Sequence, residues 1–244
     1  MLELIISEQW LTAKGVVGFF PANTDGDDVA VYKDEKRNEE IYRITNLRQQ
    51  RKKAEGLPHF CLSDFISPIG MKPDYIGGFA VTTGIGIEKK VKEFEEAGDD
   101  YNAILLKSLA DRLAEAFAER LHELVRTKYW NYSDEQSLSN DELIKEKYQG
   151  IRPAPGYPAC PDHTLKTTLF EMLSAEENTG IFLTESLAMY PAASVSGFYY
   201  SHPESKYFGL GQISEDQVND YSKRKSINKT AAEKALFPSL NYKD

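Results

Sequence analysis

Residues 99–128 read DDYNAILLKSLADRLAEAFAERLHELVRTK, and no other stretch of the chain has so clear a periodic pattern. Large apolar side chains recur along it every three or four residues, which is the spacing that places them on one face of an α-helix. These positions are Ile104, Leu105, Leu109, Leu113, Phe117, Leu121 and Leu124. Acidic residues at the start and basic residues at the end suit the helix dipole. The pattern therefore predicts one long amphipathic helix near 99–128.

Short apolar runs on both sides of this helix are typical of strands. They lie at residues 15–20, 29–32, 75–83, 181–184, 194–200 and 207–213. The first two are separated by a turn over residues 21–27 and predict a hairpin, and the last two predict a second hairpin. Two glycines in the run at 75–83 indicate that another element approaches that strand closely.

Further helices are indicated by capping residues. Ser139 with Glu142 forms a capping box before a short helix to about Tyr148, and Ser214 with Gln217 opens a helix to about Lys225. The remaining predicted helices lie at 1–11, 47–53, 164–177 and 228–237. Strands joined by hairpins, with helices around them, predict an α+β fold in which residues 1–244 form a single domain around an antiparallel sheet.

Composition narrows the classes of function. The chain has 244 residues, 41% apolar content and a formal net charge of -9, which argues against general affinity for nucleic acid or anionic membranes. No apolar run is long enough to span a membrane and no secretory leader is present, so we expect a cytoplasmic protein. No glycine-rich phosphate loop or Gly-x-Ser-x-Gly elbow occurs, so nucleotide triphosphates and serine hydrolysis are not indicated.

The second informative stretch is residues 150–163, which read GIRPAPGYPACPDH and contain four prolines. Proline fixes the backbone angle φ and removes an N–H donor, so this stretch predicts a rigid shelf with free carbonyl acceptors. Arg152 supplies a cation and Tyr157 an aromatic face on that shelf. The combination suits a small, polar, zwitterionic ligand.

The two cysteines fit a reducing compartment and give no disulfide framework. A zinc site is an alternative, with the ligands His59, Cys61, Cys160 and His163. Their spacings are not those of zinc fingers, however, so we expect two buried thiols and no metal in this chain.

Two groups of side chains allow both a functional and a structural interpretation. Asp111 and Glu115 lie one turn apart on the long helix, where they either meet a ligand amine or partner cation or form a solvated face. An aromatic group follows in the 194–208 stretch: Tyr199, Tyr200, Tyr207 and Phe208. It offers stacking surfaces for a purine ring, or simply packs across strands.

Four segments together carry a family resemblance. They are RPAPGYPACPDHT at 152–164, SVSGFYYSHPESKY at 194–207, LADRLAEAFAE at 109–119 and GFFPAN at 18–23. In this order they resemble the C-terminal activation domain of cobalamin-dependent methionine synthase, and the resemblance runs from about Leu11 to the C-terminus.

The resemblance implies a domain that binds S-adenosylmethionine and supports reductive methylation of cob(II)alamin to methylcobalamin. It implies that the cobalamin is held by another domain, and that flavodoxin or a related reductase delivers the electron. The ligand-binding positions carried over are Arg152, Ala154, Gly156, Tyr157, Tyr207, Phe208 and Glu115, with Asp111 as a contact to the cobalamin domain. No side chain is expected to act as a catalytic acid or base, because the metal itself displaces the methyl group.

One departure from the family concerns an upstream Asp-Trp-x-Pro-Phe-Phe segment, whose aspartate contacts the ligand amine in other members. This chain begins after that point, so it is expected to be N-terminally truncated relative to the family and inactive by itself in methionine synthesis. The sequence leaves open whether it is part of a longer methyltransferase or a free-standing subunit. An alternative function is an interaction module that docks the cobalamin domain or flavodoxin with weak or no ligand binding.

Overall fold

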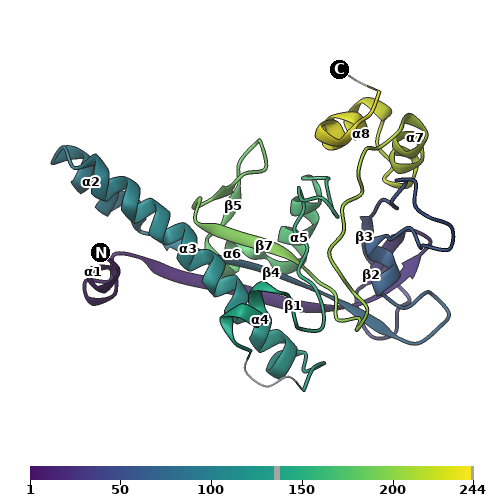
Figure 1. Cartoon of the computed structure of the whole chain (residues 1–244), viewed down its shortest axis with the longest axis horizontal. Helices are drawn as coiled ribbons and strands as arrows, with labels where there is room; N and C mark the ends of the chain where they lie inside the picture. Colours follow the sequence, from purple (N-terminus) through teal and green to yellow (C-terminus); the bar gives the residue numbers. More distant parts are fainter. Residues whose placement is uncertain (135–137, 243–244) are drawn as a thin grey trace. The chain divides into compact units, whose positions relative to one another are not determined.

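Strands joined in hairpins form the sheets of the protein (Figure 1). The computed structural model describes residues 1–134 and 138–242. Its strands are β1 (Thr12–Asp25), β2 (Asp28–Tyr32), β3 (Glu40–Thr45), β4 (Asp74–Ile85), β5 (Phe182–Leu183), β6 (Met189–Tyr190) and β7 (Ser194–Tyr199). Five of them form one sheet in the order β3-β2-β1-β4-β7, in which β1 pairs antiparallel with β2 and β2 with β3. β5 and β6 form a separate antiparallel pair.

Helices occupy much of the remaining chain. They are α1 (Leu2–Ser7), α2 (Ile87–Glu96), α3 (Asp100–Leu124), α4 (Asn140–Ile144), α5 (Leu165–Leu173), α6 (Ala175–Thr179), α7 (Glu215–Arg224) and α8 (Lys229–Leu236). Short 3-10 turns cover Leu62–Phe65 and Phe237–Ser239, and a π-helical turn at Val125–Tyr129 extends α3. Antiparallel hairpins with helices outside them make an α+β fold, which confirms the predicted class.

The chain contacts divide into two compact units. Unit 1 contains residues 1–18, 78–131 and 169–197, and unit 2 contains residues 19–77, 132–168 and 198–244. The assignment of residues 1–244 to a single domain stays a prediction.

The long helix of unit 1 confirms the prediction for residues 99–128, but its buried face differs from the predicted one. The side chains buried to within 2% are Ala103, Leu106, Ala110, Ala114, Ala118 and His122. Of the predicted positions Leu121 is buried, whereas Ile104 is 63% exposed and Leu109, Leu113 and Phe117 are half-buried. Small side chains let the helix backbone come close to β4, and Thr83 Oγ1 donates to the carbonyl of Ala110 at 2.7 Å. The helix therefore packs on β4 mainly through small side chains and a close backbone contact, and not through the row of large apolar residues that the sequence suggested.

Glycines in the strands of unit 1 mark close contacts. A Cβ at Gly78 would lie 2.7 Å from Leu169 Cδ1, and one at Gly84 would lie 2.7 Å from Pro191. A side chain at Gly15 would lie 2.9 Å from Val81 and 3.0 Å from Phe117. The close approach predicted for the strand at 75–83 is thus confirmed at Gly78.

One hydrophobic cluster of unit 2 joins its C-terminal helices to the segment that precedes them and to Leu47, which follows β3. The buried residues of this cluster are Leu47, Leu210, Ile213, Val218, Tyr221, Ala232, Leu236 and Leu240. Asn228 caps α8 by accepting a hydrogen bond from Ala231 N at 2.8 Å, and α7 starts directly after Ser214. Both C-terminal helices therefore begin where the capping residues predicted.

Several predicted boundaries are wrong. β1 continues to Asp25 through the predicted turn at 21–27, so the turn is only two residues long. Residues 207–213 form no strand. The one β-bridge in this segment is isolated and pairs Ile213 with Leu240. The second hairpin is instead β5 and β6. β3 and α2 had not been predicted.

Three helix predictions also need correction. Residues 47–53 form a loop, from which Lys53 donates to Pro58 O and Gln49 donates to Gly209 O. α4 starts with the predicted capping box but ends at Ile144. The helix predicted over 164–177 divides into α5 and α6 at Ser174, which has a left-handed φ of 43°.

Candidate functional site

The proline-rich shelf of unit 2 begins as a strand-like extension. Ile151 and Tyr200 exchange two backbone hydrogen bonds at 3.0 Å, and Phe198 N donates to Pro153 O at 2.9 Å. Successive N–H groups of an extended chain point to opposite sides, so the N–H of Arg152 faces away from this pairing. Tyr207 Oη accepts it at 2.9 Å. The backbone around Arg152 is thus held on one side by the strand-like pairing and on the other side by Tyr207.

Two successive turns complete the shelf. Tyr157 N donates to Ala154 O at 3.2 Å, with Pro155 second in the turn and Gly156 third at a φ of 98°. Proline followed by a positive-φ glycine is the pattern of a type II turn. The next turn closes with Cys160 N donating to Tyr157 O at 2.9 Å, and Gly156 N donates to Cys160 O at 2.7 Å. These bonds give the segment one defined path with little regular secondary structure.

His163 lies directly against this turn. A Cβ at Gly156 would lie 2.1 Å from His163 Cε1 and 2.4 Å from its Nδ1. The imidazole ring therefore occupies the space that any other residue at position 156 would need. Partial burial, followed by the charge of Lys166, lowers the pKa of His163 below 6.5, so the ring is neutral at pH 7.

Replacing Gly156 with Ala should destabilise the protein by about 2 kcal/mol or more, because the substitution adds backbone strain and a clash with His163. Urea unfolding followed by circular dichroism measures the change. Gly26→Ala is the matched control, since Gly26 also has a positive φ of 62° but no atom within 4 Å of the place that a Cβ would occupy. Equal losses in both variants would contradict the proposed packing of His163 on Gly156.

Asp162 anchors the far end of the shelf. Its side chain is 2% exposed, and its Oδ1 accepts from Thr164 N at 2.7 Å before α5. From α7, Tyr221 Oη donates to Asp162 Oδ2 at 2.5 Å, and Lys225 Nζ, directly after that helix, forms an ion pair with the same oxygen. Burial acts to raise the pKa of Asp162, but the Lys225 ammonium and the hydrogen bonds outweigh it and hold that pKa below 3.8. α7 is thereby tied to the shelf.

The predicted aromatic residues have different environments. Tyr207 is 38% exposed and uses its hydroxyl to hold Arg152. Phe208 packs with its ring centroid 6.0 Å from that of Phe60 and 6.4 Å from that of Phe65. Tyr199 and Tyr200 are fully buried, so the expectation that they offer stacking surfaces to a ligand is wrong.

The remaining predicted site residues fall into two groups. Tyr157 is 63% exposed, while Arg152, Ala154 and Gly156 are half-buried on the same shelf. With Tyr207 and Phe208 they belong to unit 2, where the Arg152 to Tyr207 hydrogen bond joins the two segments. Asp111 and Glu115 are exposed positions of α3 in unit 1. Their roles stay predictions.

Both cysteines of unit 2 are free and buried, as predicted. Burial raises the pKa of Cys61 to about 11 and that of Cys160 to about 12, so both are protonated thiols at neutral pH. Across residues 1–134 and 138–242, no group of three or more His, Cys, Asp and Glu side chains is arranged to hold a metal ion. The sequence had suggested His163 only as a zinc ligand, and its packing on Gly156 was missed.

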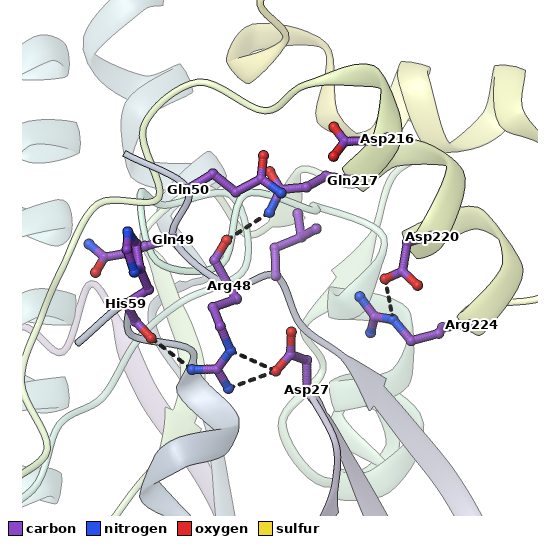
Figure 2. Close-up of a pocket in the computed structure, with 10 residues that line it drawn as sticks. Asp27, Arg48, Gln49, Gln50, His59, Asp216, Gln217, Asp220 and Arg224 are labelled. Atoms are coloured by element: carbon purple, nitrogen blue, oxygen red, sulfur yellow. Dashed lines mark hydrogen bonds and ion pairs between the residues drawn. The ribbon is translucent and has the colours of Figure 1, made fainter. Parts of the chain in front are cut away.

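A polar cavity of about 630 Å³ lies elsewhere in unit 2, between α7 and the loop that follows β3 (Figure 2). Arg48 pairs there with Asp27 at 2.6 Å, and Arg224 pairs with Asp220 at 2.7 Å. Gln217 Nε2 donates to the carbonyl of Arg48 at 2.8 Å. Because both of these arginines are already neutralised by carboxylates, neither is available to a charged ligand.

None of the described helices is both long and apolar enough to cross a membrane.

Comparison with known proteins agrees with the fold and with the family resemblance. Residues 1–226 match the family described as vitamin B12 dependent methionine synthase, activation domain. A solved structure, the crystal structure of the MetH reactivation domain bound to AdoHcy, is 54% identical, with a TM-score of 0.96. The match covers 100% of this chain and 75% of that one. The chain therefore belongs to the activation-domain family of vitamin B12-dependent methionine synthase.

Proposed function

We propose that this chain binds S-adenosylmethionine on the shelf of unit 2 and supports the reductive methylation of cobalamin in methionine synthase. The observation that carries the proposal is the 54% identical domain solved with AdoHcy, which is what S-adenosylmethionine becomes after it gives up its methyl group. The TM-score of 0.96 over the whole chain supports a similar backbone path at the shelf. The two ligands differ by one methyl group and its charge.

The chemistry of the shelf supports a zwitterionic ligand of this kind. Arg152 has a planar fork that pairs with a carboxylate through two parallel hydrogen bonds. Pro153 O and Pro158 O are already used by Phe198 and Leu210, whereas Pro155 O accepts no backbone hydrogen bond among the described residues. Such a carbonyl suits an amine or an adenine amino group. The exposed rings of Tyr157 and Tyr207 suit a sulfonium, since aromatic faces favour cations.

In this proposal the protein orients the methyl donor and holds no catalytic acid or base. Cobalamin, carried by another domain, supplies the nucleophilic metal when that domain is in place. Arg152, Ala154, Gly156, Tyr157, Tyr207 and Phe208 form the binding wall in unit 2. Glu115 and Asp111 are the acidic positions on α3 that the family resemblance assigns, Glu115 to the ligand and Asp111 to the cobalamin domain. Flavodoxin or a related reductase is the proposed electron donor.

A second candidate function is docking of the cobalamin domain without ligand binding by this chain. The exposed carboxylates of Asp111 and Glu115, one turn apart on α3, favour it, because they suit a basic partner surface. The two functions differ in whether the isolated chain binds S-adenosylmethionine.

Isothermal titration calorimetry of the wild-type chain with S-adenosylmethionine should give a saturable signal with one site, and AdoHcy should compete for it. Ligand at about a hundred times its Kd should raise the free energy of unfolding by about 2.7 kcal/mol, which thermal unfolding detects. Adenosine alone is the control, because it lacks the carboxylate for Arg152. Absence of heat and of stabilisation at millimolar ligand would refute the binding function and leave the docking function.

A further inference from the structure

The loop at residues 47–60, called the basic loop below, has a fixed conformation without regular secondary structure. Gln49 Nε2 donates to Gly209 O at 2.7 Å, and Gln49 Oε1 accepts from Phe60 N at 3.0 Å. His59 Nε2 lies 3.1 Å from the carbonyl of Arg51, and Ser214 Oγ donates to Gln50 Oε1 at 2.8 Å. Loops of this length are uncommon in compact domains unless they serve a function.

The charge of the basic loop distinguishes it from another part of unit 2. The chain has two runs of three basic residues, at 51–53 and at 223–225. In the second run Arg224 pairs with Asp28 and Asp220, and Lys225 pairs with Asp162. Ion pairs within the protein thus neutralise most of the charge of this run.

The first run keeps its charge. Arg51 and Lys52 are exposed, and the described residues place no carboxylate within ion-pair distance of either side chain. Lys53 donates only to neutral acceptors, Gln49 Oε1 and Pro58 O, both at 2.5 Å. The chain as a whole has a net charge of -9, so three consecutive unneutralised cations make this part of the surface positive in an otherwise acidic protein.

A fourth cation joins them from a different segment. Lys206 Nζ lies 4.3 Å from the ring centroid of Phe60, and Lys53 Nζ lies 4.8 Å from the same centroid. Two ammonium groups beside one ring repel each other, so an anionic group placed near them lowers the electrostatic energy. Leu57, which is 57% exposed in the same loop, adds an apolar contact among the charges.

We infer that the basic loop and Lys206 form the docking surface for an acidic electron-donor protein, whose carboxylates pair with Arg51, Lys52 and Lys206. The need for a donor rests on the proposed function, whereas the surface rests on the charges described above. Complementary charge steers a partner to one face of a protein that otherwise repels acidic surfaces.

The position of the loop also suits this role. Its contacts run to the segment 206–209, through Gln49 to Gly209 and through Phe60 to Phe208. That segment carries Tyr207, which holds the backbone of Arg152. A donor on the basic loop therefore contacts the segment that forms part of the proposed ligand wall.

The experiment measures binding of flavodoxin, as an acidic donor protein, to the full chain by surface plasmon resonance at low and moderate ionic strength. We expect salt-sensitive binding that the double variant Arg51→Glu/Lys52→Glu weakens at least tenfold at low salt. The matched control is Lys223→Glu/Lys234→Glu, which makes the same charge change at two exposed lysines of unit 2 that are not part of the basic loop. This control should retain binding within about threefold.

Three results would overturn the inference: no binding of flavodoxin by the wild-type chain at low salt, equal weakening by both double variants, or equally tight and equally loop-dependent binding of a short DNA duplex. Calorimetry with S-adenosylmethionine on the same variants keeps this test separate from the proposed function. Arg51→Glu/Lys52→Glu should bind that ligand as the wild type does. Loss of flavodoxin binding with ligand binding intact supports the docking surface alone.

Discussion

Replacing Lys225 with Met should lower the free energy of unfolding by about 3–5 kcal/mol at pH 7, because it leaves the Asp162 carboxylate buried without its counter-ion. Asp162 is 2% exposed, and its ion-pair partner is Lys225, the residue that directly follows α7. The hydrogen bond from Tyr221 Oη remains in the variant but supplies no full charge. Urea denaturation at pH 7 measures the loss.

The same variant should reverse the pH dependence of stability at this site. In the wild type the pKa of Asp162 is held below 3.8, so its contribution is present above that pH and is lost as the pH falls through the folded-state pKa. Without Lys225, burial raises that pKa above 3.8. The folded state then binds more protons than the unfolded state, and the variant should gain stability as the pH falls from 7 to 5.

Lys223→Met is the matched control, since Lys223 is an exposed lysine two positions before Lys225, in the last turn of α7. It should change stability by less than about 1 kcal/mol and leave the pH dependence as in the wild type. If Lys225→Met and Lys223→Met had the same slope of stability between pH 5 and pH 7, the carboxylate would not be the group that Lys225 stabilises.

Local patterns in the sequence predicted the elements whose cause is local. The long helix, the first hairpin, the capping box at Ser139 and the cap at Asn228 all depend on residues within a few positions of each other. Periodicity and side-chain caps are physical signals of that range. These elements were therefore found, with errors mainly at their ends.

The errors arose where tertiary contacts decide. Ala110 and Ala114 line the buried face of α3 because β4 comes close, whereas the periodic pattern favoured the larger Leu109 and Leu113. Residues 207–213 include the apolar side chains of Phe208, Leu210 and Ile213, which pack into a hydrophobic cluster of unit 2 without forming a strand. Neither effect is visible in a window of neighbouring residues.

The sequence predicted which residues form the shelf, but not the long-range hydrogen bonds and ion pair that hold it in place. The prolines and Gly156 indicated the shelf in the sequence. Gly156 has a positive φ, which glycine adopts more easily than any other residue. What holds the shelf comes from elsewhere in the chain: Tyr207 on Arg152, and Tyr221 with Lys225 on Asp162. Long-range hydrogen bonds of this kind leave no spacing in the sequence.

Replacing Arg152 with Ala should weaken the binding of S-adenosylmethionine by about thirtyfold to a thousandfold, which corresponds to about 2–4 kcal/mol. The proposed contact is a bidentate pair with the ligand carboxylate on a shelf whose backbone is already fixed by Tyr200 and Tyr207. Removing the guanidinium leaves that carboxylate without a cation in a half-buried place. Calorimetric titration measures the affinity.

Two further variants separate charge from geometry. Arg152→Lys keeps the charge but not the planar fork, so its affinity should lie between those of the wild type and Arg152→Ala. Arg51→Ala removes an exposed arginine of the same unit and should leave the affinity unchanged within about twofold. Thermal unfolding without ligand checks that each variant folds, since Tyr207 bonds to the backbone of residue 152 and that bond survives the substitution. Equal affinities for Arg152→Ala and Arg51→Ala would place the ligand carboxylate away from Arg152 and would move the proposed binding wall off the shelf.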